Sequence, residues 1–395
     1  MSLNNSKSGK NNTETPAASA AAMLVKSSSG AGKSESLQAL RGLAFAGIFL
    51  GHFYYFGWTP VSVSVFFVLS GFLLTLRNKD GNEKTGFKDV VSEAWNRIRK
   101  LYPLHLVLMV ICIPLTIYRA GYFDAMDILI KVVCNVFLIQ SLVPDSDIAA
   151  SLNGVSWYLS TILILYLIFP YLYRAFKKIG SKAVYAGLII LWIVLQTAVL
   201  FVTYRYCRID SMIVYLTHCC PLYRIFDLLC GMMLGFMFRE DRGSDKSGVS
   251  GSKAGSNTSE STAGVVVKSI LELAVIVIVG YLVWLWQNDN TNIFLSHAPV
   301  IPVLSVMLVW LFYKKSGFLT KLLTNKITVF VGNVSGYAFL IHFPIVVYIN
   351  TFIFPHLSVL KRTIIHGILF PGSVTATLVL SYLYATRIAG KFKKS

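Results

Sequence analysis

Residues 37–56, which decide the fold, read LQALRGLAFAGIFLGHFYYF. The stretch is long enough to cross a bilayer as a helix, because the hydrocarbon core is about 30 Å thick and takes about 20 mostly apolar residues. It also carries two ionisable residues, Arg41 and His52. A helix turns by 100° per residue, so this spacing places both side chains on one face, roughly 16 Å apart along the axis. Because an ionisable residue inside a membrane span is costly, each is a functional hypothesis.

The rest of the chain repeats this apolar pattern. Of the 395 residues, 55% are hydrophobic and 14% are charged, against about 45–50% and about 25% in a soluble domain. The composition predicts an all-α protein that crosses the membrane about ten times. The ten candidate spans are residues 37–56, 61–76, 101–118, 155–173, 183–202, 221–238, 265–286, 299–313, 329–353 and 363–386.

An eleventh apolar stretch, Ile128 to Val143, is short and contains Lys131, Asn135 and Gln140. Counting it as a span would move a lysine-rich loop and the lysine-rich C-terminus outside, against the tendency of basic residues to stay in the cytoplasm. We therefore expect a re-entrant or interfacial segment at this place, with both termini in the cytoplasm.

Three segments differ in composition from the spans. Residues 1–36 are rich in Ser, Ala, Asn and Gly and predict a disordered cytoplasmic tail. Residues 239–268 are rich in Ser and Gly and predict a flexible cytoplasmic linker. Residues 387–395 are expected to form a basic cytoplasmic tail. The membrane domain should therefore cover residues 37–386, and the cell membrane is its expected location.

Charge and cysteine content exclude two kinds of site. The chain holds 36 Lys and Arg against 18 Asp and Glu, a net charge of +18, yet its apolar runs leave no continuous soluble domain for a nucleic-acid surface. The six cysteines show no metal-ligand spacing, so no metal is expected. A disulfide from Cys207 to Cys219 or Cys220 stays open as the weaker alternative to free thiols.

A basic cluster stands at the start of the third span. Arg97, Arg99 and Lys100 come directly before Leu101 and Pro103, and proline is tolerated in the first turn of a helix. Cations at a helix start can hold the phosphates of a cofactor. The alternative is anchoring to lipid headgroups at the inner face of the membrane.

A second histidine lies in a later span. His342 is expected at an outer depth similar to that of His52, so the two could share a site. Histidine suits general-base work at neutral pH because its unperturbed pKa lies near 6.5. In the alternative interpretation, Arg41 is a snorkelling anchor at the inner end and His52 is a histidine whose hydrogen bonds are satisfied within the bundle.

Six stretches resemble the successive signatures of the acyltransferase-3 family, in that family's order and over nearly the whole membrane portion. They are RGLAFAGIFLGH at 41–52, VFFVLSGFLL at 65–74, RIRKLYPLH at 97–105, NGVSWYLSTILILYLIFPYL at 153–172, RIFDLLCGMMLGF at 224–236 and SGYAFLIHFP at 335–344.

This resemblance implies a ten-helix membrane enzyme that moves an acyl group, usually acetyl from cytoplasmic acetyl-CoA, to a hydroxyl of a cell-surface carbohydrate. The family's arginine and histidine pair falls on Arg41 and His52, with His52 as the expected catalytic residue. Its basic pair falls on Arg97 and Lys100, where lysine replaces the second arginine and can make only a point-charge contact. The place of a glutamate that many relatives carry is taken by Ile162, so no carboxylate role is expected there.

We expect His52 to remove the proton from a sugar hydroxyl. Arg41 would bind the donor or polarise its carbonyl, and the cluster of Arg97, Arg99 and Lys100 would hold the phosphates of acetyl-CoA or another acyl-CoA. Four further residues are expected to bind or orient the substrate: His342, Trp157, Ser160 and Tyr337. The expected partners are the lipid bilayer and a cell-surface carbohydrate, and a homodimer is left open.

Three alternatives stay open at this point. The acyl group could pass through a covalent acyl-His52 intermediate rather than move directly. The chain could instead be a carrier or flippase for a lipid-linked sugar, although we find no inverted repeat; its path would be lined by Arg41, His52, Asp227, Glu272 and His342. A catalytically inactive acyl-CoA sensor is the third alternative, which the intact Arg41 and His52 argue against.

Overall fold

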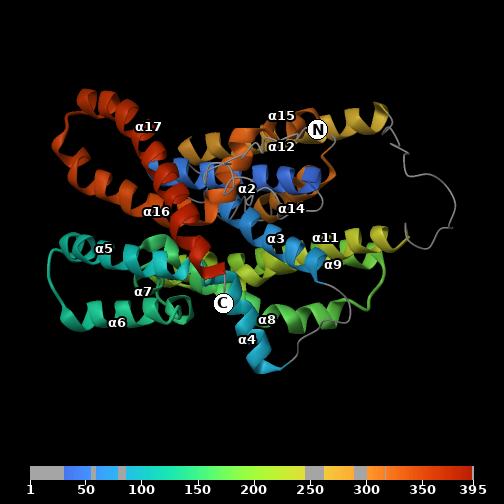
Figure 1. Cartoon of the computed structure of the whole chain (residues 1–395), viewed down its shortest axis with the longest axis horizontal. Helices are drawn as coiled ribbons and strands as arrows, with labels where there is room; N and C mark the ends of the chain where they lie inside the picture. Colours follow the sequence, from blue (N-terminus) through green and yellow to red (C-terminus); the bar gives the residue numbers. More distant parts are fainter. Residues whose placement is uncertain are drawn as a thin grey trace, which may run out of the picture.

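The computed structural model describes residues 31–54, 59–78, 86–244, 262–288, 300–315 and 317–393. Within these residues every regular element is helical, and none is a strand. The long helices fall on the ten predicted spans (Figure 1). They are α2 (Ala31–Tyr54), α3 (Thr59–Arg77), α5 (Tyr102–Ala120), α8 (Trp157–Phe176), α9 (Lys182–Tyr206), α11 (Pro221–Ser244), α12 (Thr262–Asn288), α14 (Val300–Lys314), α16 (Lys326–Phe352) and α17 (Val359–Leu383).

Eight helical segments in the described part of the chain are long and apolar enough to cross a membrane. Of the predicted spans, α14 is a shorter apolar helix of 15 residues, and α2 has 24 residues but carries Gln38, Arg41 and His52. The prediction of an all-α protein with many membrane-spanning helices is confirmed.

Short elements connect the long helices. They are α4 (Phe87–Ile98), α6 (Ala125–Val136), α7 (Ser146–Ala149), α10 (Asp210–Val214), α15 (Phe318–Leu323), the 3₁₀ segments η1 (Gln140–Leu142), η2 (Gly154–Ser156), η4 (Phe354–His356) and η6 (Ala389–Lys393), and the π turns η3 (Tyr215–Cys219) and η5 (Tyr384–Ile388). The eleventh apolar stretch forms α6 and the turn after it. With 12 residues, α6 is about 18 Å long, which is too short to cross the bilayer.

Several predicted boundaries differ from the structure. Helix α2 begins at Ala31, before the predicted end of the N-terminal tail, and the rest of that tail, residues 1–30, lies outside the described residues. The predicted linker 239–268 is helical at both ends, because α11 continues to Ser244 and α12 begins at Thr262, and its middle, 245–261, lies outside the described residues. The predicted tail 387–395 begins as helical turns. All six cysteines are free thiols, so the disulfide alternative is not formed.

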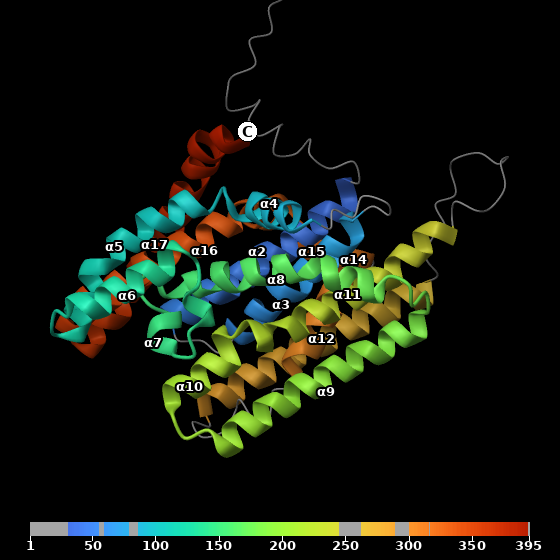
Figure 2. The same cartoon turned by 90° about the horizontal axis from the view of Figure 1, so that it is seen from below.

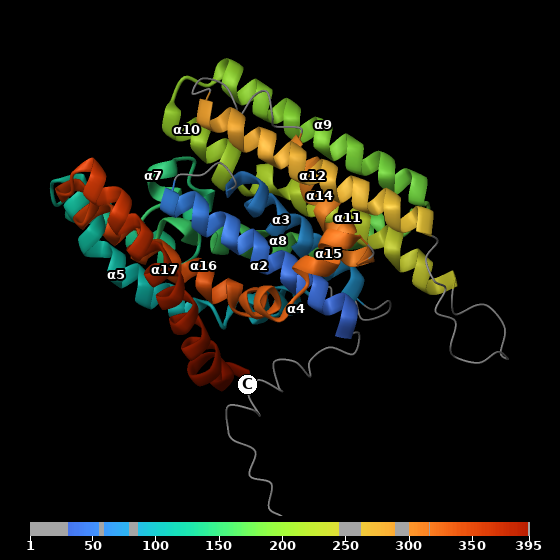
Figure 3. The same cartoon turned by 90° about the horizontal axis from the view of Figure 1, so that it is seen from above.

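The helices form a bundle with the two pairs α2/α16 and α3/α11 at its centre. Helices α9 and α12 lie along one side and α5 and α17 along the other (Figures 2 and 3). Small residues bring the central pairs close together, as is common between membrane helices. A Cβ added at Gly332 of α16 would lie 1.8 Å from the Gln38 carbonyl oxygen of α2, and one added at Gly231 of α11 would lie 1.9 Å from the Val68 carbonyl oxygen of α3. These contacts fix the relative positions of the polar residues that the four helices carry.

Candidate active site

The two histidines singled out in the sequence are in direct contact. Nδ1 of His52 on α2 lies 2.9 Å from Nε2 of His342 on α16, and the two rings are stacked with their centroids 5.2 Å apart. His342 is fully buried, whereas His52 remains partly exposed. The prediction that both residues reach the same depth is therefore confirmed.

The hydrogen bonds assign the protons of this pair. Nδ1 of His342 lies 3.2 Å from the carbonyl oxygen of Ala338; because a carbonyl oxygen only accepts, Nδ1 carries the hydrogen. In a neutral ring the other nitrogen then accepts, so Nε2 of His342 accepts from Nδ1–H of His52. This leaves Nε2 of His52 unprotonated and without a hydrogen bond in the described part of the chain. A lone pair held in this way is what a general base requires.

Aromatic rings hold the histidine pair in place. Phe49 and Phe45, about one and two turns below His52 on α2, place their ring centroids 5.8 and 5.6 Å from that of His342. Phe343 packs edge-on against His52 at 5.5 Å. The imidazoles therefore have little freedom to turn away from each other.

A second group of predicted residues lines a cavity nearer the other end of α2. The cavity has a volume of about 310 Å³, and its walls include Arg41, Arg97, Lys100 and Tyr337. Its remaining lining residues are Gln38, Phe66, Ser70, Ile98, Leu101, Tyr158, Leu159, Ile162, Tyr166, Gly332, Asn333, Ser335, Gly336, Phe339 and Leu340. We call it the cationic cavity. Four residues predicted separately from the sequence thus share one cavity, while Arg99 is not among its lining residues.

The turn between α4 and α5 positions two of these cations. Arg97, in the last turn of α4, forms an ion pair with Glu93, and its guanidinium lies 5.5 Å from the ring centre of Tyr166. The hydroxyl of Tyr384 donates to the carbonyl oxygen of Lys100 over 3.1 Å. The turn is therefore held from both sides, and Arg97 and Lys100 line the same cavity as Arg41 from a fixed backbone.

One layer of aromatic side chains separates the cationic cavity from the histidine pair. Phe66, Tyr158 and Phe339 line the cavity, and their ring centroids lie 5.3 to 6.4 Å apart. Phe339 also packs against His342, with 5.9 Å between centroids. The cavity thus ends about one helical turn below the histidines.

Sequence comparison identifies the family to which the chain belongs. The profile of a family described as an acyltransferase domain matches residues 34–386. The chain belongs to the acyltransferase-3 family. A stretch of 130 residues is 37% identical to acyltransferase MdmB of Streptomyces mycarofaciens and covers 31% of this chain and 30% of that relative. No solved structure matches the chain.

Two predicted site residues lie outside the cationic cavity. Ser160 is fully buried, and its hydroxyl donates to the carbonyl oxygen of Leu138 over 2.6 Å and contacts the hydroxyl of Ser141 at 2.7 Å. These contacts join α8 to the segment after α6, a structural task. Trp157 packs its ring on His218, with centroids 4.7 Å apart. Neither residue contacts the cavity.

The two acidic residues named for the carrier alternative both have hydrogen-bond partners in the structure. Asp227 forms a buried ion pair with Arg224 at 3.2 Å and accepts from the hydroxyl of Ser64 over 2.8 Å. The sequence does not reveal Arg224, Asp227 and Ser64 as a cluster, although a charged residue within a membrane span is a signal that points to it.

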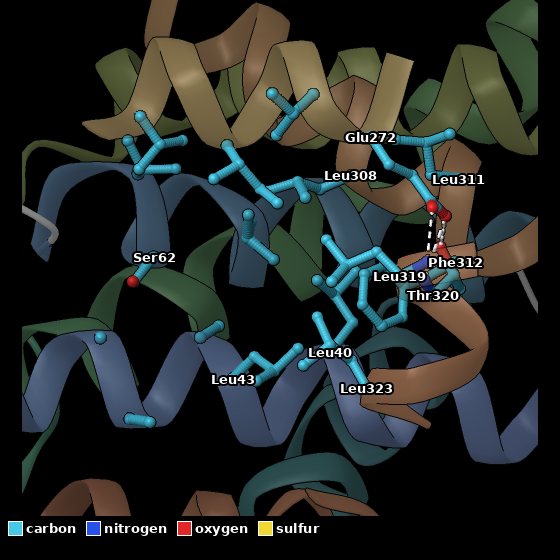
Figure 4. A pocket seen from close by; sticks show the side chains of 18 of the residues that line it. Leu40, Leu43, Ser62, Glu272, Leu308, Leu311, Phe312, Leu319, Thr320 and Leu323 are labelled. Carbon is cyan, nitrogen blue, oxygen red and sulfur yellow. Dashed lines mark hydrogen bonds between the residues drawn. The ribbon is translucent and has the colours of Figure 1, made fainter. Parts of the chain in front are cut away.

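Glu272 belongs to a different cavity, on the other face of α2. It lies at one end of an apolar cavity of about 320 Å³ lined by α2, α3, α12 and α14 residues such as Leu40 and Leu308 (Figure 4). Its carboxylate accepts from the backbone N–H groups of Leu319 and Thr320 at 2.7 and 3.1 Å. Glu272 therefore caps α15.

Proposed function

We propose that this acyltransferase moves an acyl group, most simply acetyl, from cytoplasmic acyl-CoA to a hydroxyl of a cell-surface polysaccharide or lipid-linked sugar. One observation carries the proposal. An oriented histidine with a free nitrogen stands one aromatic layer beyond a cavity lined by three cationic side chains. The histidine is suited to activate a hydroxyl, and the cavity is suited to hold an anionic donor.

The histidine pair supplies the base. Nε2 of His52 takes the proton from the acceptor hydroxyl while the hydroxyl oxygen attacks the thioester carbonyl. The carbon–sulfur bond then breaks, CoA leaves as the thiolate, and His52 returns the proton to that thiolate. His342 orients His52 through the bond at Nδ1 and disperses the charge that His52 gains.

The cationic cavity supplies the donor site. Its volume of about 310 Å³ lies at the lower end of the range for small-molecule pockets, so it suits part of CoA, the pantetheine arm, rather than the whole molecule. Arg97 and Lys100 at its wall are suited to phosphates. Arg41 lies about three turns below His52 on α2, so of the two roles expected for it, binding the donor is favoured over polarising the reacting carbonyl.

The aromatic layer implies a movement before transfer. Phe339 lines the donor cavity and packs on His342 of the histidine pair, so we infer that the acyl thioester displaces this ring to reach the base. An apolar layer of this kind would also keep water from the thioester while no acceptor is present.

Two alternatives concern the path of the acyl group. In the first, a covalent relay, Nε2 of His52 attacks the thioester and carries the acyl group to the acceptor. The nitrogen that is free to act as a base is equally free to act as this nucleophile. Radiolabel on the protein after a single turnover without acceptor would favour the relay. The carrier alternative needs no acyl donor, and membership of an acyltransferase family speaks against it.

The experiment uses the purified full chain in lipid nanodiscs with radiolabelled acetyl-CoA and surface polysaccharide from cells that lack the protein. We expect label on the polysaccharide with the native chain and none with His52→Ala. In sealed vesicles, transfer should need acetyl-CoA on the cytoplasmic side. Sugar flux into vesicles without transfer to any glycan, or transfer that survives His52→Ala, would contradict the proposal.

A further inference from the structure

A third histidine, His218, lies beside the outer end of the site on the π turn η3. Single π turns are frequent at functional sites. This one is held by the N–H of Cys220, which donates to the carbonyl oxygen of Tyr215 over 2.9 Å, and by the hydroxyl of Thr161, which donates to the carbonyl oxygen of Cys219 over 2.8 Å. The backbone that carries the His218 ring is thus fixed on both sides.

Arg224 assigns the proton of His218. Its Nη2 lies 3.3 Å from Nδ1 of His218, and its Nε donates to the His218 carbonyl oxygen over 2.8 Å. A guanidinium only donates, so Nδ1 of His218 accepts and the ring hydrogen is on Nε2. Arg224 is itself held by Asp227 and stacks over Trp157, 5.8 Å from the ring centre. His218 is therefore a neutral ring that presents an N–H donor.

His218 and the His52 base are linked by packing contacts through the turn that opens α8. The turn that opens α8 joins the two: a Cβ at Gly154 would lie 2.6 Å from the ring of Phe343, which packs on His52, and Trp157 packs on His218. His218 is partly exposed, and its Nε2 makes no hydrogen bond among the described residues.

We propose that Nε2–H of His218 donates to the carbonyl oxygen of the acyl group during transfer, an inference that rests on the proposed function. When the acceptor oxygen attacks, the carbonyl oxygen gains the negative charge and the hydrogen bond to His218 strengthens. When the carbon–sulfur bond breaks, the electron pair returns to the carbonyl, and His218 keeps its proton throughout. A fixed neutral donor aimed at developing charge is an effective way to stabilise a transition state.

In this role one acyl group would contact both rings. A base and an oxyanion donor each act over about 3 Å, on opposite sides of the carbonyl carbon under attack. His52 would contact the acceptor hydroxyl and His218 the carbonyl oxygen, from α2 and from η3. Arg224 and Asp227 are then positioning residues, since they fix the His218 ring without contacting the acyl group.

Three variants, two of them a matched pair, test this role in nanodiscs, with acetyl-CoA and the polysaccharide acceptor. His218→Phe keeps a ring on Trp157 but has no N–H, and we expect kcat to fall about 10²–10³-fold with little change in KM for acetyl-CoA. His218→Gln retains an N–H donor and should recover part of the loss, whereas His218→Glu, of the same size, has no donor and should not.

Binding of a non-reactive acyl-CoA thioether reports whether each variant is folded. The proposal is overturned if folded His218→Phe retains more than a tenth of kcat. If His218→Phe does not fold, equal activities of His218→Gln and His218→Glu overturn it. Loss of transfer in His52→Ala with normal transfer in all His218 variants would reject only the role of His218, whereas transfer by His52→Ala would reject the proposed function itself.

Discussion

In the orientation we propose, the cationic cavity forms the inner end of this site and the histidine pair its outer end, and the two ends are built in different ways. At the inner end, cations stand around a cavity, and Arg97 is largely exposed on α4. At the outer end, His52 and His342 are locked by short hydrogen bonds and aromatic packing on helices that touch at glycine. The inner end can tolerate a shift of a side chain because charge acts at a distance. The outer end cannot, because proton transfer needs contact geometry.

The largest effect is expected at the outer end. His52→Ala removes the proposed base without adding a charge, so kcat should fall about 10²–10⁴-fold while the protein stays folded. The matched control is His356→Ala, at an exposed histidine of η4, which should keep full activity. Initial rates of CoA release with acceptor present provide the measurement. If His52→Ala retains a tenth or more of the native activity, His52 is not the base, and the outer end is no more sensitive to substitution than the inner end.

His342→Ala should have the next largest effect, because His52 then loses the acceptor that keeps its Nδ1 protonated. We expect kcat to fall at least about tenfold with KM for acyl-CoA almost unchanged, the pattern of an interaction made in the transition state. His342→Gln offers an amide oxygen to Nδ1 and should recover part of the activity. Equal losses in the alanine and glutamine variants would mean that His342 only fills space.

Charge removal at the inner end should act on binding instead. Arg97→Ala and Lys100→Ala are each expected to raise KM for acyl-CoA about tenfold, or about 1.4 kcal/mol, with kcat nearly constant. The increase should shrink in high salt, where exposed charges are already screened. Lys88→Ala removes the same charge from the exposed side of α4 and should leave KM unchanged. A fall in kcat rather than a rise in KM would mean that the inner end, like the outer end, acts on the chemical step and not on donor binding.

The sequence predicted the helices and much of the site because both follow from local patterns. Apolar length predicted the ten spans, and residue spacing placed Arg41 and His52 on one face of α2. The sequence predicted only that His52 and His342 lie at a similar depth. It did not predict their direct contact, because this contact depends on how α2 and α16 pack at Gly332.

Other features had no local signal. Ser160 was expected to bind substrate, but its hydroxyl bonds to Leu138, a partner in a separate element that no spacing along α8 indicates. The cluster of His218, Arg224 and Asp227 joins a π turn to α11, and π turns have no clear sequence pattern. Buried polar contacts between distant elements are set by tertiary packing, which a single sequence does not reveal.

The smallest effect is expected away from both ends, at Glu272. Its carboxylate accepts from the N–H groups of Leu319 and Thr320, and the positive end of α15 favours its negative charge. Glu272→Gln keeps one acceptor oxygen and loses the other, so we expect a stability loss of about 1 kcal/mol and unchanged kcat and KM. Thermal unfolding of the purified protein, measured beside its initial rates, tests this. A change in kinetics without a lower melting temperature would mean that the apolar cavity on the other face of α2 is coupled to the reaction through α2 and α3, which line both cavities.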